Sequence, residues 1–155
     1  MIRITGDCPV IDYSIIDKMI EEFCKLDEMK KIDYMSNFDI MKNTFPRGMD
    51  VEIIKMETLK IAYEYAEKLS EREHVTPYIY NNPNKFKLMG YINEGEDLSG
   101  YRLTLDTKED FNLIEVIYEN LYEKDNNFGL NDIINFIKSN PKVLDINKNI
   151  IQKTL

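Results

Sequence analysis

Apolar residues recur along this chain with two different spacings, and each spacing predicts one kind of secondary structure. Where they recur every three or four residues, they predict amphipathic helices. Where they alternate with polar residues, or form short runs rich in β-branched residues, they predict strands. The predicted helices are residues 14–26, 57–69, 111–122 and 131–138, and the predicted strands are 3–5, 34–36, 51–55, 86–92 and 101–105. Strands and helices that alternate in this order are typical of an α/β fold with an open sheet.

Local signals refine the ends and the inward faces of these helices. Ser14 and Asp17 are spaced as an approximate capping box at the start of the first helix. Thr76 followed by Pro77 predicts the N-cap and the first residue of a short additional helix. The residues expected to face inward are Leu59, Ala62, Tyr63, Ala66 and Leu69 in the second helix, and Phe111, Ile114, Ile117, Tyr118 and Leu121 in the third.

Two acidic residues stand where predicted strands end. Asp7 lies in the turn at residues 6–9 after the first strand, and Asp106 directly follows the strand at 101–105. Because ligands of open α/β sheets bind at strand ends, two carboxylates there suggest a shared divalent cation. The same residues also fit structural roles, Asp7 as the start of a turn and Asp106 as the N-cap of the helix beginning near Lys108. Both interpretations stay open at this level.

The composition narrows the class of protein. A chain of 155 residues with 43% hydrophobic content is long enough for one domain, which we place at residues 1–147 with a polar tail at 148–155. A net charge of −8 disfavours nucleic acids and anionic membranes as partners. Cys8 and Cys24 lack metal-ligand spacing, and no apolar run approaches the ~18 residues of a membrane span. These features predict a cytoplasmic protein with reduced thiols.

Four segments, taken together and in order, resemble one known family. They are residues 3–12, 48–52, 72–79 and 105–110, and the resemblance runs from residue 1 to about residue 147. The chain resembles the spore coat polysaccharide biosynthesis protein F family. That family belongs with the sugar cytidylyltransferases, such as the CMP-KDO and CMP-sialic acid synthetases.

The resemblance implies a fold, a reaction and a set of site residues. The fold is a nucleotidyltransferase of the glycosyltransferase-A type, a three-layer sandwich with a mixed sheet, which uses CTP and Mg²⁺ to activate a sugar or sugar acid. The implied metal ligands are Asp7 and Asp106, and the implied substrate-binding residues are Arg3, Arg47, Gly48, Asp50, Glu73 and His74. Arg47 departs from the pattern, because family members often carry a small or acidic residue there. From the residues alone, a single histidine beside an acid is also typical of a structural, hydrogen-bonded side chain.

The resemblance also predicts what the chain lacks. Relatives begin with a strand and a loop rich in Arg, Gly, Ser and Lys that binds the triphosphate. The sequence has six glycines, and none of them lies in a loop of this kind. We therefore expect the acceptor side and the metal side of a larger enzyme, without its N-terminal nucleotide-binding third and inactive alone. A bare sheet edge would then be covered by a second copy, as a homodimer, or by a complementing N-terminal half. The alternatives are a non-catalytic remnant that acts through self-association or a partner chain, and an acidic adaptor whose helices bind partners.

Overall fold

The computed structural model describes residues 1–38, 40 and 42–151, and within them a mixed four-stranded sheet forms the centre. The strands are β1 (Ile2–Arg3), β2 (Tyr34–Ser36), β3 (Glu52–Ile54) and β4 (Leu88–Gly90), in the spatial order β1-β3-β2-β4. β3 pairs antiparallel with β1 and with β2, whereas β2 pairs parallel with β4. The α/β fold class and the mixed sheet predicted from the sequence are therefore confirmed.

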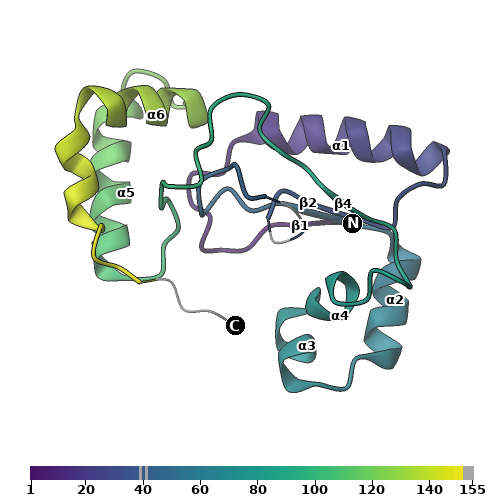
Figure 1. Ribbon diagram of the computed structural model, residues 1–155. Coiled ribbons are helices and arrows are strands. Elements are labelled where there is room, and N and C mark those ends of the chain that lie inside the picture. The colour runs from purple at the N-terminus through teal and green to yellow at the C-terminus, as the bar shows by residue number, and fades with distance from the viewer. Residues whose placement is uncertain (39, 41, 152–155) are drawn as a thin grey trace.

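Helices cover both faces of this sheet, as Figure 1 shows. Helix α1 (Tyr13–Glu28) lies on one side, and α2 (Met56–Tyr65), α3 (Leu69–His74) and α4 (Pro77–Tyr80) lie on the other. Successive strand residues point to opposite faces, so Met35 and Ile53 join the core under α1, while Tyr34 and Ile54 join the core under α2 and α4. The result is the expected three-layer arrangement.

The C-terminal elements pack beside the sheet and extend the core on the α1 side. They are α5 (Lys108–Leu121), α6 (Leu130–Ser139) and the 3₁₀ helix η1 (Pro141–Ile146). Leu113, Ile117 and Ile133 are fully buried in the same hydrophobic cluster as Ile15 and Met19 of α1. Figure 1 shows α5 and α6 at the end of the sheet away from α2 and α3. Residues 152–155 of the predicted polar tail lie outside the described residues.

The helix predicted over residues 57–69 is wrong in its C-terminal part. The chain leaves the helix at Ala66, whose ψ of 122° is extended, and α3 is a separate short helix that the periodicity did not predict. This break rotates the following residues off the apolar stripe. Leu69 is consequently 87% exposed. Tyr63 lies before the break, inside α2, and is also exposed, at 74%, whereas Ala62 and Ala66 are buried as expected. The Tyr63 ring instead lies 5.4 Å from the Arg72 guanidinium.

Two predicted helix starts also differ from the structure. The N-cap of α1 is Asp12, whose side chain accepts a hydrogen bond from the Ser14 N–H at 2.8 Å, so the predicted capping box at Ser14 is wrong. The N-cap of α5 is Thr107, which forms a capping box with Asp110. Asp106 is therefore not the cap, and α5 begins at Lys108, as the N-cap interpretation expected and three residues before the start of the periodic pattern at 111. The predicted start of α4, with Pro77 after Thr76, is confirmed.

The predicted strand at residues 101–105 does not join the sheet. Its regular pairing is a single parallel bridge between Arg102 and Arg47. Its neighbours are the loops that carry Asp7 and Arg47, and loops offer no continuous ladder of backbone groups. Within the described residues, no helix is both long enough and apolar enough to cross a membrane.

Candidate functional site

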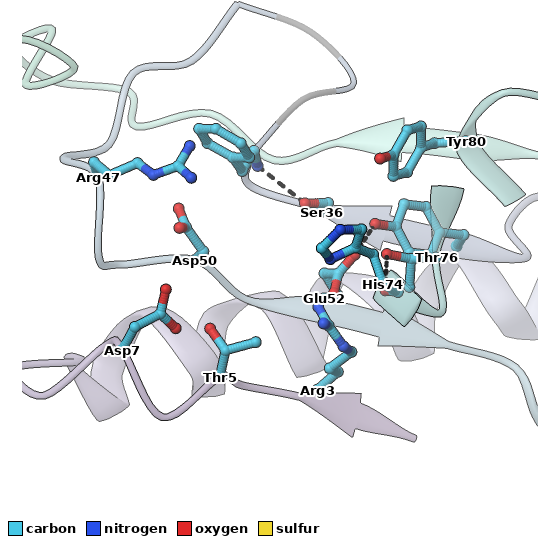
Figure 2. A pocket seen from close by; sticks show the side chains of 12 residues that line it. Arg3, Thr5, Asp7, Ser36, Arg47, Asp50, Glu52, His74, Thr76 and Tyr80 are labelled. Carbon is cyan, nitrogen blue, oxygen red and sulfur yellow. Dashed lines mark hydrogen bonds and ion pairs between the residues drawn. The ribbon is translucent and has the colours of Figure 1, made fainter. Parts of the chain in front are cut away.

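A polar cavity of about 170 Å³ opens beside the sheet, next to the turn between α3 and α4. Figure 2 shows Asp7, Arg47 and Asp50 at one side of it, which we call the loop wall, and His74, Thr76 and Tyr80 at the other, which we call the turn wall. Three adjacent strand segments form the floor between these walls. The lining residues are Arg3, Thr5, Asp7, Tyr34, Ser36, Phe38, Arg47, Asp50, Glu52, His74, Thr76 and Tyr80.

The structure brings most of the sequence-predicted site residues to this cavity. Five of the eight line it: Arg3, Asp7, Arg47, Asp50 and His74. They come from segments as far apart in the chain as residue 3 and residue 74. The described residues that line the cavity do not include Gly48, Glu73 or Asp106. The roles of all eight in metal or substrate binding stay predictions.

Asp7 is held in a turn that the segment 101–105 anchors. The turn closes through a hydrogen bond of 3.2 Å from the Cys8 N–H to the Thr5 carbonyl. A turn is therefore present as predicted, but it begins at Thr5, and Asp7 is its third residue rather than its start. The Asp7 carbonyl accepts from the Leu105 N–H at 2.9 Å and from the Thr104 hydroxyl at 3.0 Å. Burial, with the nearby charges of two carboxylates, raises the pKa of the Cys8 thiol, so the turn carries its negative charge on Asp7.

The loop that carries Arg47 and Asp50 is held by the same segment. The Leu103 N–H donates to the Arg47 carbonyl at 2.7 Å, and the Arg47 N–H donates to the Tyr101 carbonyl at 3.0 Å. Gly48 makes this close approach possible, because its φ is +94° and a Cβ there would lie 2.5 Å from the Leu103 carbonyl carbon. Gly48 thus shapes the loop wall without lining the cavity.

Asp110 fixes the conformation of this anchoring segment. Its carboxylate is fully buried and accepts from the Arg102 Nε at 2.9 Å, the Arg102 Nη2 at 2.8 Å and the Asn147 Nδ2 at 3.0 Å. The backbone N–H groups of Asp106 and Thr107 donate to it at 3.2 Å and 3.1 Å. Burial opposes ionisation, but these hydrogen bonds, led by Arg102, outweigh it and lower the pKa of Asp110 to about 2.

Asp106 points to this network in the structure. Its carboxylate accepts from the Arg102 Nη2 at 2.8 Å, and its side chain is 39% exposed. Asp7 instead shares the loop wall with Asp50. Among the described residues, no three acidic, histidine or cysteine side chains gather as a metal site. Mg²⁺ commonly takes only one or two carboxylates and fills its other positions with phosphate oxygens and water, so the donor set of Asp7 fits this metal.

The floor of the cavity is a charge-balanced network that the sequence analysis missed. Glu52 forms an ion pair with Arg3 and accepts a hydrogen bond from the Tyr34 hydroxyl. Burial and the Glu52 charge raise the pKa of Tyr34 far above its ordinary value, so it stays a neutral donor. A sequence signal for the floor exists, because polar residues at alternate positions of neighbouring strands share one face. These positions are Arg3 and Thr5, Tyr34 and Ser36, and Asp50 and Glu52.

Arg47 brings a cationic group to the loop wall. Its guanidinium lies 4.6 Å from the centre of the Phe38 ring, which orients it by a cation–π contact. In contrast to Arg3, whose charge Glu52 balances, Arg47 presents its charge beside Asp50 across from the turn wall. Such a side can bind phosphate or carboxylate oxygens together with a metal ion.

Comparison with known proteins identifies the family to which this chain belongs. A sequence profile described as cytidylyltransferase matches residues 1–138. The chain belongs to the cytidylyltransferase family. A solved structure of a cytidylyltransferase from Leptospira borgpetersenii is similar to it, with a TM-score of 0.83 and 36% identity over 99% of this chain. The nucleotidyltransferase fold expected from the sequence is therefore confirmed.

Two further relatives place this cytidylyltransferase-family chain among longer proteins. An uncharacterized protein of Methanocaldococcus jannaschii is 37% identical over 99% of the chain. The spore coat polysaccharide biosynthesis protein SpsF of Bacillus subtilis is 28% identical over 91% of it. The chain spans 59% and 55% of the lengths of these two relatives, and 60% of the Leptospira cytidylyltransferase.

Proposed function

We propose that this chain forms the acceptor side and the metal side of a cytidylyltransferase that transfers CMP from CTP to a sugar or sugar acid. The observation that carries the proposal is the single cavity where Asp7, Arg47, Asp50 and His74 meet. Membership of the cytidylyltransferase family supports the reaction type. The likeness to SpsF supports a role in surface or spore-coat polysaccharide biosynthesis. We propose the cytoplasm as the place of this role.

In the proposed reaction a hydroxyl oxygen of the acceptor attacks the α-phosphorus of CTP. A new P–O bond forms to the sugar, the bond from the α-phosphorus to the oxygen bridging to the β-phosphate breaks, and pyrophosphate leaves with that oxygen. The hydroxyl proton passes to solvent. Mg²⁺, when bound, would neutralise the charge that develops on the phosphates. Asp7 would hold it, whereas Asp106, the second ligand that the family resemblance implies, would first have to leave its ion pair with Arg102.

The two walls of the cavity suit the two parts of this reaction. Arg47 and Asp50 lie beside Asp7, where phosphate oxygens and a cation would be bound. The turn wall offers His74, Thr76 and Tyr80, which can donate and accept hydrogen bonds as sugar hydroxyls do. Substrate binding between the walls would bring the acceptor hydroxyl to the phosphate side.

A second candidate function is a non-catalytic or complementing half that acts through self-association or a partner chain. The observation that favours it is the edge strand β1, where Ile2 is 43% exposed and the following Ile4 is 41% exposed. An edge strand with exposed apolar residues is a template for pairing with another strand. Because the longer relatives contain further residues, we also propose that transfer activity needs that remaining part, in the same polypeptide or in a second one.

The deciding experiment measures pyrophosphate release from CTP and Mg²⁺ with a panel of sugars and sugar acids. The 155-residue chain is assayed alone and joined to the part of a longer relative that it does not cover. We expect release only from the joined protein, and at least a hundredfold loss in its Asp7→Asn variant. Release that needs no sugar, or that survives Asp7→Asn, would overturn the transferase proposal. No release from either form, with a sedimenting dimer, would favour the second candidate.

A further inference from the structure

The backbone between α3 and α4 is strained at one residue. Val75 has φ 70° and ψ −50°, and the Thr76 N–H donates to the His74 carbonyl at 2.8 Å. Together these define a γ-turn of the rare and strained hand. Positive φ at a β-branched residue is an outlier, and such outliers persist only where the surrounding structure over-determines them.

The next residue is also held in an unfavourable conformation. Thr76 has φ −96° and ψ −15°, in the helical region, although it precedes Pro77. A proline normally drives the preceding residue away from that region. The strained backbone between His74 and α4 is therefore at Val75, and Pro77 limits the conformations of the residue that follows it. Strain of this kind gathers at ligand clamps and active sites.

The strained turn separates two cavities. His74 and Thr76 line the polar cavity, as Figure 2 shows, whereas Val75 lines a different cavity of about 410 Å³ between α2 and α3. That second cavity is mostly apolar, and its other lining residues are Leu59, Lys60, Ala62, Tyr63, Ala66, Glu71 and Arg72. The valine side chain, which is 37% exposed, therefore lines one cavity while its two neighbours line the other.

Thr76 connects the turn to the rest of the polar cavity. Its side chain is buried, its hydroxyl donates to the His74 carbonyl at 3.5 Å, and it lines the cavity together with Tyr34, the residue that donates to Glu52 in the floor. Its carbonyl accepts from the Ile79 N–H at 2.9 Å and from the Tyr80 N–H at 3.3 Å, which begins α4 and places Tyr80 on the turn wall. A change in the turn would therefore move the whole wall.

We propose that Val75 is a positioning residue that holds His74 and Thr76 in place to receive the acceptor. The proposal rests on the proposed function for its ligand, but its structural part stands by itself. The γ-turn reverses the chain within three residues, so His74 and Thr76 both face the polar cavity. The contacts of the partly exposed valine side chain with the lining of the apolar cavity restrict the turn, whereas a glycine would lose these contacts and gain alternative conformations.

Two substitutions at residue 75 test the strain. Val75→Ala and Val75→Gly both remove the methyl groups that line the apolar cavity, so their difference reports the backbone. At an unstrained position glycine is the less stable of the two, and at positive φ the order reverses. We expect the glycine variant to have the higher thermal midpoint. An alanine variant that is more stable than the glycine variant would overturn the inference of strain.

The NMR signals of His74 test whether Val75 positions the turn wall. His74 is the single histidine of the chain, so its ring protons give one assignable pair of NMR signals. In Val75→Gly we expect these signals to move toward the values of an unstructured peptide, and the Thr76 amide to exchange with solvent at least tenfold faster. Unchanged His74 signals in a folded Val75→Gly protein would show that valine does not position this wall.

Lys30 provides the matched control, because it also has positive φ, at 54°, but follows α1 and does not line the cavity. Lys30→Gly should be more stable than Lys30→Ala and should leave the His74 signals unchanged. In a protein that shows CMP transfer, Val75→Gly should raise KM for the acceptor about tenfold with a smaller change in kcat. If no transfer occurs, the proposed function fails while the NMR and stability measurements still decide the role of Val75.

Discussion

The two walls of the polar cavity are held in opposite ways. On the loop wall, Asp7 and Arg47 are tied to the segment 101–105, which the buried Asp110 and Arg102 fix with hydrogen bonds at good geometry. On the turn wall, His74 and Thr76 depend on a strained turn between two short helices. The site therefore combines a side that buried hydrogen bonds hold in place with a side that depends on one strained turn. The first should fail sharply when one buried partner is lost, and the second should change shape without unfolding.

The largest expected effect is at Asp110. Asp110→Asn removes the buried negative charge opposite Arg102 and leaves this cation only the half-exposed Asp106 as an acidic partner, which should lower the free energy of unfolding by about 3 kcal/mol. Urea unfolding followed by circular dichroism measures this change. The control is Asp106→Asn, whose half-exposed ion pair with the same arginine should cost less than about 1 kcal/mol. Equal losses in the two variants would mean that Asp110 does not fix the loop wall.

The pH dependence gives the same network a second readout. The pKa of Asp110 falls from the ordinary 3.8 to about 2 on folding. A lowered folded pKa means that its contribution is fully present above the unfolded value and is lost as the pH falls from about 4 toward 2. Wild-type stability should therefore decline in that window more steeply than that of Asp110→Asn. Parallel acid profiles of the two proteins would contradict this assignment.

A smaller loss is expected at Gly48. Gly48→Ala places a Cβ 2.5 Å from the Leu103 backbone at φ +94°, so the loop that carries Arg47 and Asp50 must shift. We expect a loss of about 2–3 kcal/mol, from overpacking and the positive φ together. Gly100→Ala is the control, because a Cβ there has no atom within 4 Å and should change stability by less than about 1 kcal/mol. A tolerated alanine at residue 48 would show that the loop wall is softer than its contacts indicate.

Sequence patterns predicted this fold where one regular element packs on another. Residues 34–36 form the strand that their pattern predicted, and α1 and α6 agree with prediction to within about two residues at each end. The predicted strand at residues 101–105 is wrong because this segment has the composition of a strand but packs against loops. No propensity rule predicts positive φ at Val75, since a valine there is unfavourable in isolation.

The residues of the cavity also differ in whether the sequence could predict them. Asp7 can be found from its place after a strand, and Arg47, Asp50 and His74 from the family resemblance. Tyr34 and Glu52 could be found from alternation along neighbouring strands, once the strand order is known. The close approach of Gly48 to Leu103 depends on a contact between two loops, and the ion pair of Arg102 with Asp110 depends on a contact between a loop and the first turn of α5. Such contacts have no periodicity that a single sequence could show.

The smallest expected effect lies on the turn-wall side, at Leu69. The helical stripe predicted this residue in the core, but it begins α3 with its side chain 87% exposed. Leu69→Ala should therefore change the free energy of unfolding by less than about 0.5 kcal/mol, because little apolar surface is removed from contact. The matched control is Leu113→Ala on α5, where the fully buried side chain should cost about 2–5 kcal/mol. A loss above 2 kcal/mol at Leu69 would mean that in solution something covers α3, either the chain itself or a second copy. A sedimentation measurement on the same variant would separate these two cases, because only a second copy would make the loss depend on protein concentration.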